Sequence, residues 1–237
     1  MLDPIKHSEH TEKIVCKYVD GIQYKKYYRF RPNLFYGGIS TADCVGCNLR
    51  CIFCWAWNTV NKPEKRGKFY SPSEVARKLV RIAKEKGFKK IRISGNEPTI
   101  GKEHLLSVLE KVYEKAPGLR FVLETNGILL GYDEDYVKEL SKFDNLHIRV
   151  SLKACNPKEF KKYSNAENKY FGYQLKALKN LEKYQCNYHP ALIMGENIEN
   201  LNRELNKINT SLPFKLERES LILYPNVKNR LNNQKLF

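Results

Sequence analysis

The chain has 237 residues, 42% of them hydrophobic, and a formal net charge of +16. That length suits one large α/β domain with a sizeable core, and no apolar run is long enough to cross a membrane. The first 12 residues are polar and lack the apolar core of a signal peptide, so we expect a cytoplasmic protein that does not engage a membrane.

The predicted elements begin with an N-terminal β-hairpin extension, to which we assign residues 1–36. Lys13–Val19 and Ile22–Phe30 are rich in strand-forming residues, and Asp20-Gly21 between them is a hairpin turn signal. A short strand at Gly38–Cys44 then leads into a cysteine-rich loop that continues to about residue 70.

Helical and strand patterns alternate from residue 71 onward. The capping box Ser71-Pro72-Ser73-Glu74 predicts the start of the first helix. The later predicted elements are, in chain order, strand Lys90–Gly95, helix Lys102–Ala116, strand Arg120–Thr125, a helix capped by Asp133, strand Leu146–Leu152, a short helix from Asn156, a helix from about Tyr170 to Tyr184, strand Tyr188–Met194, a helix capped by Asn197 and strand Leu216–Tyr224. Strands joined by helices favour parallel pairing with right-handed crossovers.

Six strand–helix steps, counted from Gly38–Cys44, are too few to close an eight-stranded barrel. We therefore predict an α/β fold, a partial (β/α)6 TIM-like barrel over residues 37–226. Lys228, Arg230 and Lys235 fall in a basic C-terminal tail at residues 227–237. In barrels of this kind the chemistry collects at the carboxyl ends of the strands.

Three of the seven cysteines form the run Cys47-x3-Cys51-x2-Cys54, directly after the first predicted barrel strand. In a cytosolic protein, cysteines indicate metal or redox use rather than disulfides. Three thiolates this close can ligate three irons of a cubane iron–sulfur cluster, and the fourth iron then has no ligand from this loop. The run therefore predicts a cluster with one open iron.

A structural zinc site and buried structural thiols are the alternatives for this loop. Zinc prefers four ligands, and Cys44 could supply the fourth thiolate. No second closely spaced pair follows, because Cys155 and Cys186 occur singly. Cys16 likewise has no spacing that demands a metal. The sequence leaves open whether any of four thiols binds a metal, namely Cys16, Cys44, Cys155 and Cys186.

The cysteine run, with the aromatic Phe53 before its last member, resembles the signature of the radical S-adenosylmethionine (SAM) superfamily. The alternating strands and helices resemble that family's partial barrel, over roughly Gly38–Tyr224. The resemblance implies that Cys47, Cys51 and Cys54 bind a [4Fe–4S] cluster, that SAM chelates its fourth iron, and that Phe53 lies at the cofactor site. It implies an oxidoreductase or activase that cleaves SAM reductively to a 5′-deoxyadenosyl radical.

Three shorter matches place further SAM contacts. Gly95-Asn96-Glu97-Pro98 resembles the family's Gly-Gly-Glu motif, which meets the amino group of SAM, although Asn96 replaces the second glycine. Thr125-Asn126-Gly127 resembles the family's segment after the third strand and implies a contact from Asn126. Both sequences also make ordinary turns.

Ser151-Leu152-Lys153 resembles the fourth-strand segment of glycyl-radical activating enzymes. Ser151 and Lys153 share a strand face, since side chains alternate, and one could bond the ribose and the other the SAM carboxylate. A solvated lysine at a strand end is the alternative for Lys153. The segment Ala191–Glu196 is a weaker match, predicted to be core strand and turn.

The resemblance also implies a low-potential electron donor protein and leaves the substrate open. An open barrel suits a macromolecule, so we expect a protein that receives a glycyl radical. The Cys-Ile-Phe-Cys-Trp run also resembles wyosine-type tRNA-modifying enzymes, and the positive charge would suit RNA, although the 30 lysines and 12 arginines are dispersed. A metal-stabilised nucleic-acid-binding module without enzyme activity is the third alternative.

Overall fold

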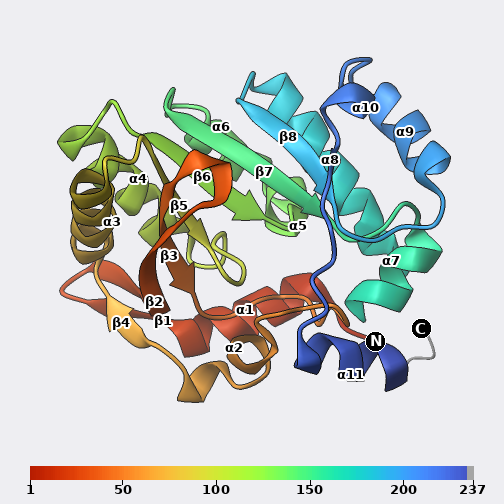
Figure 1. Ribbon diagram of the computed structural model, residues 1–237, viewed down its shortest axis with the longest axis horizontal. Helices are drawn as coiled ribbons and strands as arrows, with labels where there is room; N and C mark the ends of the chain where they lie inside the picture. Colours follow the sequence, from red (N-terminus) through yellow and green to blue (C-terminus); the bar gives the residue numbers. More distant parts are fainter. Residues whose placement is uncertain (234–237) are drawn as a thin grey trace.

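A nine-stranded sheet organises the computed structural model, which describes residues 1–233 (Figure 1). The strands are β1 (Cys16–Val19), β2 (Ile22–Asn33), β3 (Ile39–Cys44), β4 (Lys68–Tyr70), β5 (Lys90–Ser94), β6 (Arg120–Thr125), β7 (Leu146–Leu152), β8 (Tyr188–Leu192) and β9 (Glu217–Arg218). Their order is β1-β2-β3-β5-β6-β7-β8-β9, and β4 pairs with β2.

All neighbours from β3 to β9 pair in parallel, whereas β2 is antiparallel to β1, β3 and β4. The six parallel strands, β3 and β5 to β9, confirm the predicted partial (β/α)6 barrel, and β1 and β2 form the predicted hairpin. Because β2 covers the free edge of β3, the hairpin ends the barrel on that side.

Helices cover the outer face of the sheet (Figure 1). The α-helices are α1 (Pro4–Val15), α2 (Trp57–Asn61), α3 (Pro72–Lys86), α4 (Lys102–Lys115), α5 (Ile128–Tyr132), α6 (Glu134–Leu140), α7 (Pro157–Ser164), α8 (Phe171–Lys183), α9 (Ile198–Asn206), α10 (Leu212–Lys215) and α11 (Pro225–Asn233). Three short 3-10 helices are η1 (Phe35–Gly37), η2 (Pro63–Lys65) and η3 (Asn168–Tyr170). The predicted Ser71–Glu74 capping box begins α3.

Three segments differ from the sequence-based prediction. Residues 4–15 form α1, with Asp3 as its N-cap, so the first hairpin strand begins at Cys16 rather than Lys13. Only Glu217–Arg218 of the predicted strand Leu216–Tyr224 pairs in the sheet, as β9. Residues 219–224 instead cross the open side of the barrel, and we call them the strap (Figure 1).

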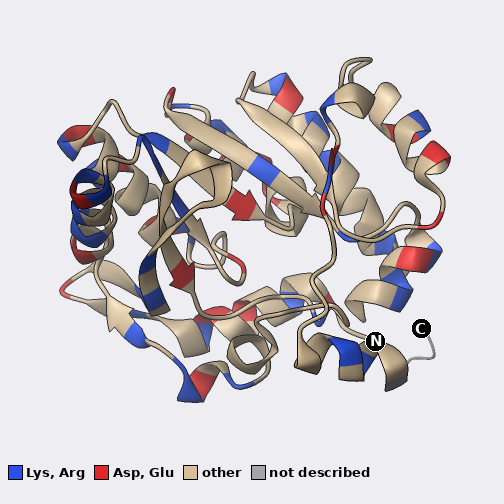
Figure 2. Cartoon of the chain, in the orientation of Figure 1, with Lys and Arg blue, Asp and Glu red and all other residues tan. Residues whose placement is uncertain are grey.

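The third difference concerns the segment after Tyr224. Residues 225–233 form α11, and the side chains of Val227 and Leu231 are fully buried in the core. The predicted basic tail at 227–237 is therefore helical up to residue 233, while Lys235 lies outside the described residues. Lys and Arg residues are spread over helices and strands around the molecule in Figure 2. No helix within residues 1–233 has the length and apolar character to cross a membrane.

Candidate functional site

The ten residues predicted to hold cofactors line one cavity of about 160 Å³. They are Cys47, Cys51, Phe53, Cys54, Gly95, Asn96, Glu97, Asn126, Ser151 and Lys153. They come from the loop after β3 and from the carboxyl ends of β5, β6 and β7. Parallel strands bring their carboxyl ends to one edge of the sheet, which is why residues up to 106 positions apart meet here. We call this space the cysteine cavity.

The cysteine loop is fixed by backbone hydrogen bonds. The Ile52 amide donates to the Tyr163 carbonyl at 2.9 Å, and the Arg50 amide donates to the Ser164 carbonyl at 3.1 Å, which tie the loop to α7. Within the loop, the Leu49 amide donates to the Cys47 sulfur at 3.5 Å. The conformation of the cysteine loop is thus held by hydrogen bonds to α7 and within the loop itself.

Burial makes the three thiols poor acids. It raises the pKa of Cys51 to about 12, against the opposing effect of Lys153, and it raises the pKa values of Cys47 and Cys54 as well. Thiolate is the form that binds metal, so iron binding at this loop releases protons. Within residues 1–233, no three His, Cys, Asp or Glu side chains are close enough together to hold one metal ion. A [4Fe–4S] cubane would take the three thiolates on three different irons, so it does not require them to meet at one metal ion.

Gly95 brings the chain close to β3. Its φ is +96°, and a Cβ there would lie 3.0 Å from the Cβ of Asp43, so only glycine fits without strain. The neighbouring Asn96 needs no such freedom, since the described non-glycine residues with positive φ do not include it. Its amide Nδ2 donates to the carbonyl of Cys44 at 2.7 Å. The departure from Gly-Gly-Glu thus adds a link to the end of β3, where the cysteine loop begins.

The carboxylate of Glu97 is 1% exposed and joins the ends of β5 and β6. Oε1 accepts hydrogen bonds from the hydroxyls of Thr99 and Thr125, both at 2.7 Å, and Oε2 accepts from the Asn126 amide at 2.8 Å. The predicted contact of Glu97 with the SAM amino group stays a prediction, and it would be added to these bonds.

Asn126 and Gln174 connect three loops at this edge. Asn126 donates through Nδ2 to Oδ1 of Asn48 at 2.6 Å, inside the cysteine loop. Gln174, fully buried on α8, donates to the carbonyls of Asn126 at 2.5 Å and Ser151 at 3.2 Å and accepts from the amide of Lys153. Gln174 could not be predicted as a site residue from sequence, because its position depends on how α8 packs.

Ser151, in β7, and Lys153, directly after the end of β7, lie on the same side of the chain, as the strand period predicts. Lys153 Nζ donates to the Ser151 hydroxyl at 2.7 Å and lowers the pKa of Cys51 electrostatically, against the larger effect of burial. Lys153 is therefore a cation of the cavity wall rather than a solvated strand-end lysine.

Comparison with known proteins identifies the family. The model of the radical SAM superfamily matches residues 43–208. The chain belongs to the radical SAM superfamily. A probable GTP 3′,8-cyclase of Methanococcus vannielii is 34% identical over 122 residues, which are 51% of this chain and 38% of that protein. The GTP 3′,8-cyclase of Desulforamulus reducens is 32% identical over 132 residues, 56% of this chain and 38% of that protein. The chain thus matches well under half the length of these relatives.

Solved structures support the fold. TYW1 with a lysine–pyruvate adduct bound has a TM-score of 0.52 at 15% identity, covering 83% of this chain and 72% of that one. Streptococcus suis SuiB bound to S-adenosylmethionine has a TM-score of 0.54 at 21% identity, covering 69% and 35%. The chain is therefore an enzyme of a superfamily that uses a [4Fe–4S] cluster and SAM, and such enzymes need an electron donor.

A second, larger cavity adjoins the radical SAM site. It has a volume of about 510 Å³ and lies between β2, the strap and the inner wall of the barrel, and we call it the lumen cavity. Seven residues line both cavities, namely Phe53, Trp55, Ser94, Glu124, Arg149, Ile193 and Glu219. Of these seven, the sequence-based prediction assigned a cofactor role to Phe53 alone. The polar side chains of Ser94, Glu124 and Arg149 come from β5, β6 and β7, and that of Glu219 comes from the strap.

Proposed function

We propose that this chain is a radical SAM enzyme that abstracts hydrogen from a small-molecule substrate in the lumen cavity. The observation that carries the proposal is the shared wall: the cavity lined by the three cysteines opens beside a space of about 510 Å³, a size typical of small-molecule sites. The relatives' names support it, since GTP is a small molecule.

The residues of the cysteine cavity take distinct parts in this proposal. Cys47, Cys51 and Cys54 would hold the cluster. When bound, the cluster supplies the electron that splits SAM into methionine and a 5′-deoxyadenosyl radical. Lys153 would attract the SAM carboxylate, and Ser151, its hydrogen-bond partner, would hold it in place.

The other predicted cofactor residues would either contact SAM or position the segments that contact it. Gly95 lets the backbone approach β3, and Asn96 holds that segment against Cys44, the residue at which the cysteine loop begins. Glu97 would accept from the SAM amino group, and Asn126 would orient it from the next strand. Phe53 would exclude water on the side shared with the lumen cavity.

Anaerobic reconstitution with iron and sulfide, followed by dithionite and SAM, tests the proposed chemistry. The expected product is 5′-deoxyadenosine, detected by chromatography and lost in Cys51→Ala. Cys186→Ala, which removes a thiol outside both cavities, is the matched control and should form the product. An intact cluster that yields no 5′-deoxyadenosine would falsify the proposal.

A macromolecular substrate, either a protein that receives a glycyl radical or an RNA, is the second candidate. Exposed apolar residues at the mouth of the lumen cavity favour it: Phe35 is 59% exposed and Ile222 is 53% exposed. Binding of bulk tRNA, measured against salt concentration, separates an RNA substrate from a protein substrate. Strong binding at low salt that weakens steeply as salt rises would support RNA, and its absence would remove RNA.

A further inference from the structure

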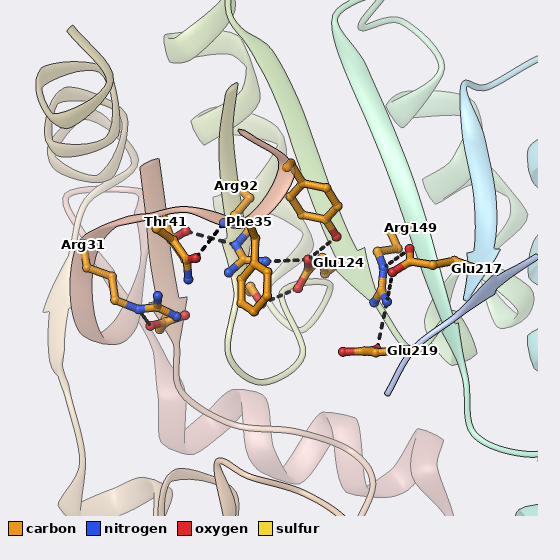
Figure 3. A network of polar contacts seen from close by, with 12 residues as sticks. Arg31, Phe35, Thr41, Arg92, Glu124, Arg149, Glu217 and Glu219 are labelled. Atoms are coloured by element: carbon orange, nitrogen blue, oxygen red, sulfur yellow. Dashed lines mark hydrogen bonds and ion pairs between the residues drawn. The ribbon is translucent and has the colours of Figure 1, made fainter. Parts of the chain in front are cut away.

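The wall of the lumen cavity carries charged side chains, and at each of its two ends the positive and negative charges are unequal in number. Figure 3 shows Arg31 and Glu219 at opposite ends of this network, with Arg92 and Glu124 between them. Arg92 donates through Nη1 to Oε1 of Glu124 at 2.7 Å, so the centre of the wall is electrically balanced. Burial raises the pKa of Glu124, but Arg92 and Arg149, together with hydrogen bonds from Ser94 and Tyr36, outweigh it, and the pKa falls.

At the β2 end, two guanidinium groups share one carboxylate. Arg29 and Arg31 each donate through Nε to the same oxygen of Asp43, at 2.7 and 3.0 Å, and the Asp43 side chain is fully buried. One positive charge therefore remains unbalanced. Among the described residues, no acceptor bonds the Nη atoms of either arginine. Both side chains line the lumen cavity and are partly exposed to it.

This arrangement suits an oxyanion. Asp43 fixes both guanidinium groups by their Nε edge, which leaves the Nη edges oriented before a ligand arrives. Guanidinium groups held in this way lose little conformational freedom on binding, and their planar edge matches a carboxylate or a phosphate. Trp55 supports Arg29 from one side, with the guanidinium 5.9 Å from the ring centre.

At the strap end the imbalance has the opposite sign. Arg149 donates to both oxygens of Glu217, at 2.9 and 3.0 Å, and to Oε2 of Glu219 at 2.8 Å. Glu217 also bonds Nε2 of His189 at 2.8 Å, so its oxygens are occupied. Within residues 1–233, Arg149 is the only hydrogen-bond partner of the Glu219 carboxylate, and its Oε1 has none. Glu219 lines both cavities and therefore presents a free acceptor where they meet.

We propose that the lumen cavity binds a small dipolar molecule, whose carboxylate or phosphate group accepts hydrogen bonds from Arg29 and Arg31 and whose cationic or N–H-rich end donates to Glu219. This inference rests on the proposed function, because it names the substrate chemistry of the same site. The end that meets Glu219 lies at the wall shared with the cysteine cavity, and so it is the end nearest the site of radical formation.

Tryptophan fluorescence provides the test. The chain has two tryptophans, and the background variant Trp57→Phe leaves only Trp55, on the cavity wall, as reporter. The probes are para-aminomethylbenzoate, which is dipolar, para-methylbenzoate, which lacks the cation, and para-aminomethylphenylphosphonate, which carries the other oxyanion. We expect the dipolar carboxylate or phosphonate to bind about tenfold more tightly than para-methylbenzoate, from one lost charge-assisted bond. Whichever of the two dipolar probes binds with higher affinity identifies carboxylate or phosphate as the preferred group.

Two substitutions assign the ends. Arg31→Met should weaken all three probes about tenfold or more, and it should fold, because Arg29 still pairs with the buried Asp43. Glu219→Gln should remove the advantage of the dipolar probes over para-methylbenzoate. The matched control is Arg81→Met, which removes an exposed arginine of α3 and should change nothing.

Equal affinity for the dipolar probes and para-methylbenzoate, no binding of any probe, or unchanged affinity in Arg31→Met would each overturn the inference. Formation of 5′-deoxyadenosine by the wild-type protein without probe is measured in parallel. Its absence would defeat the proposed function, whereas its presence with unselective probes would defeat only the dipolar site.

Discussion

Arg230 on the C-terminal helix α11 donates through Nε to the carbonyl oxygen of Ile52, in the middle of the cysteine run, at 3.0 Å. Its Nη2 donates to the carbonyl of Cys54 as well, and its guanidinium lies 4.6 Å from the ring centre of Trp57. Val227 and Leu231, three residues before and one after Arg230 and so on the same side of the helix, are fully buried. The end of the described chain therefore holds the loop that would carry the cluster.

Replacing Arg230 with methionine should loosen this loop. The substitution keeps much of the apolar stem but leaves two loop carbonyls without their charged donor, which corresponds to a loss of about 1–3 kcal/mol. After anaerobic reconstitution, we expect iron to pass to a chelator several-fold faster than from the wild-type protein. Absorbance at the cluster band, followed over time, measures this rate.

Lys228→Met is the matched control, because it removes one positive charge from an exposed position of the same helix. If both variants lose iron at the same raised rate, charge rather than the hydrogen bonds of Arg230 is responsible. If Arg230→Met loses iron no faster than wild type, α11 has no role in holding the loop.

The barrel strands and the residues of the cysteine cavity could be predicted from the sequence, whereas helix α11 could not. The six parallel strands were predictable because each is followed by a helix, and the ten site residues could be grouped because they follow the ends of strands. Helix α11 was missed because its pattern is mostly Asn, Lys and Arg, with only Val227 and Leu231 facing the core. Its stability comes from packing on the cysteine loop, a tertiary effect that local pattern does not contain.

The residues of the lumen cavity were missed for a related reason. Arg29 and Arg31 alternate along an antiparallel strand, where they look like an ordinary exposed face. Their inward position follows from the pairing of β2 with β3, which places them beside Asp43. Glu219 follows a strand of two residues, too short to register as a strand end.

Gln174 should be important for stability despite its distance from the cysteines. Gln174→Leu retains similar volume but leaves the carbonyls of Asn126 and Ser151 without a donor in a buried place. We expect a loss of about 1–3 kcal/mol in the free energy of unfolding, measured by urea denaturation. Lys179→Leu, at an exposed position of the same helix, is the control and should change stability by much less. Equal losses in both variants would mean that the bonds of Gln174 contribute little.

The three cysteines of the loop should act as a set. Cys47→Ala, Cys51→Ala and Cys54→Ala should each abolish the cluster absorbance after reconstitution, because a cubane held by two thiolates is no longer retained. Cys44→Ala should keep it, since Cys44 does not line the cysteine cavity. Iron and sulfide analysis of each purified variant provides the measurement. A cluster that survives in Cys54→Ala but not in Cys44→Ala would move the third ligand to Cys44.

Stability should fall in mild acid because of His104. This side chain is buried on α4, where Nδ1 donates to the carbonyl of Gln23 at 2.9 Å and Nε2 accepts from the Tyr27 hydroxyl at 3.0 Å. Burial lowers its pKa to about 3. The unfolded chain therefore takes up the proton first, at its ordinary pKa of about 6.5. Between those values the free energy of unfolding should decrease as pH falls, by at most about 1.4 kcal/mol per pH unit for this one group.

Urea denaturation at a series of pH values measures that slope. In His104→Gln the slope should shrink but not vanish, because burial also lowers the pKa of His7, to about 4. His10→Gln, at an exposed position of α1, leaves the buried His104 in place and should retain most of the slope. If the two variants show the same pH dependence, protonation of His104 is not what limits the fold in acid, and the bond from Tyr27 would have to persist on the charged ring.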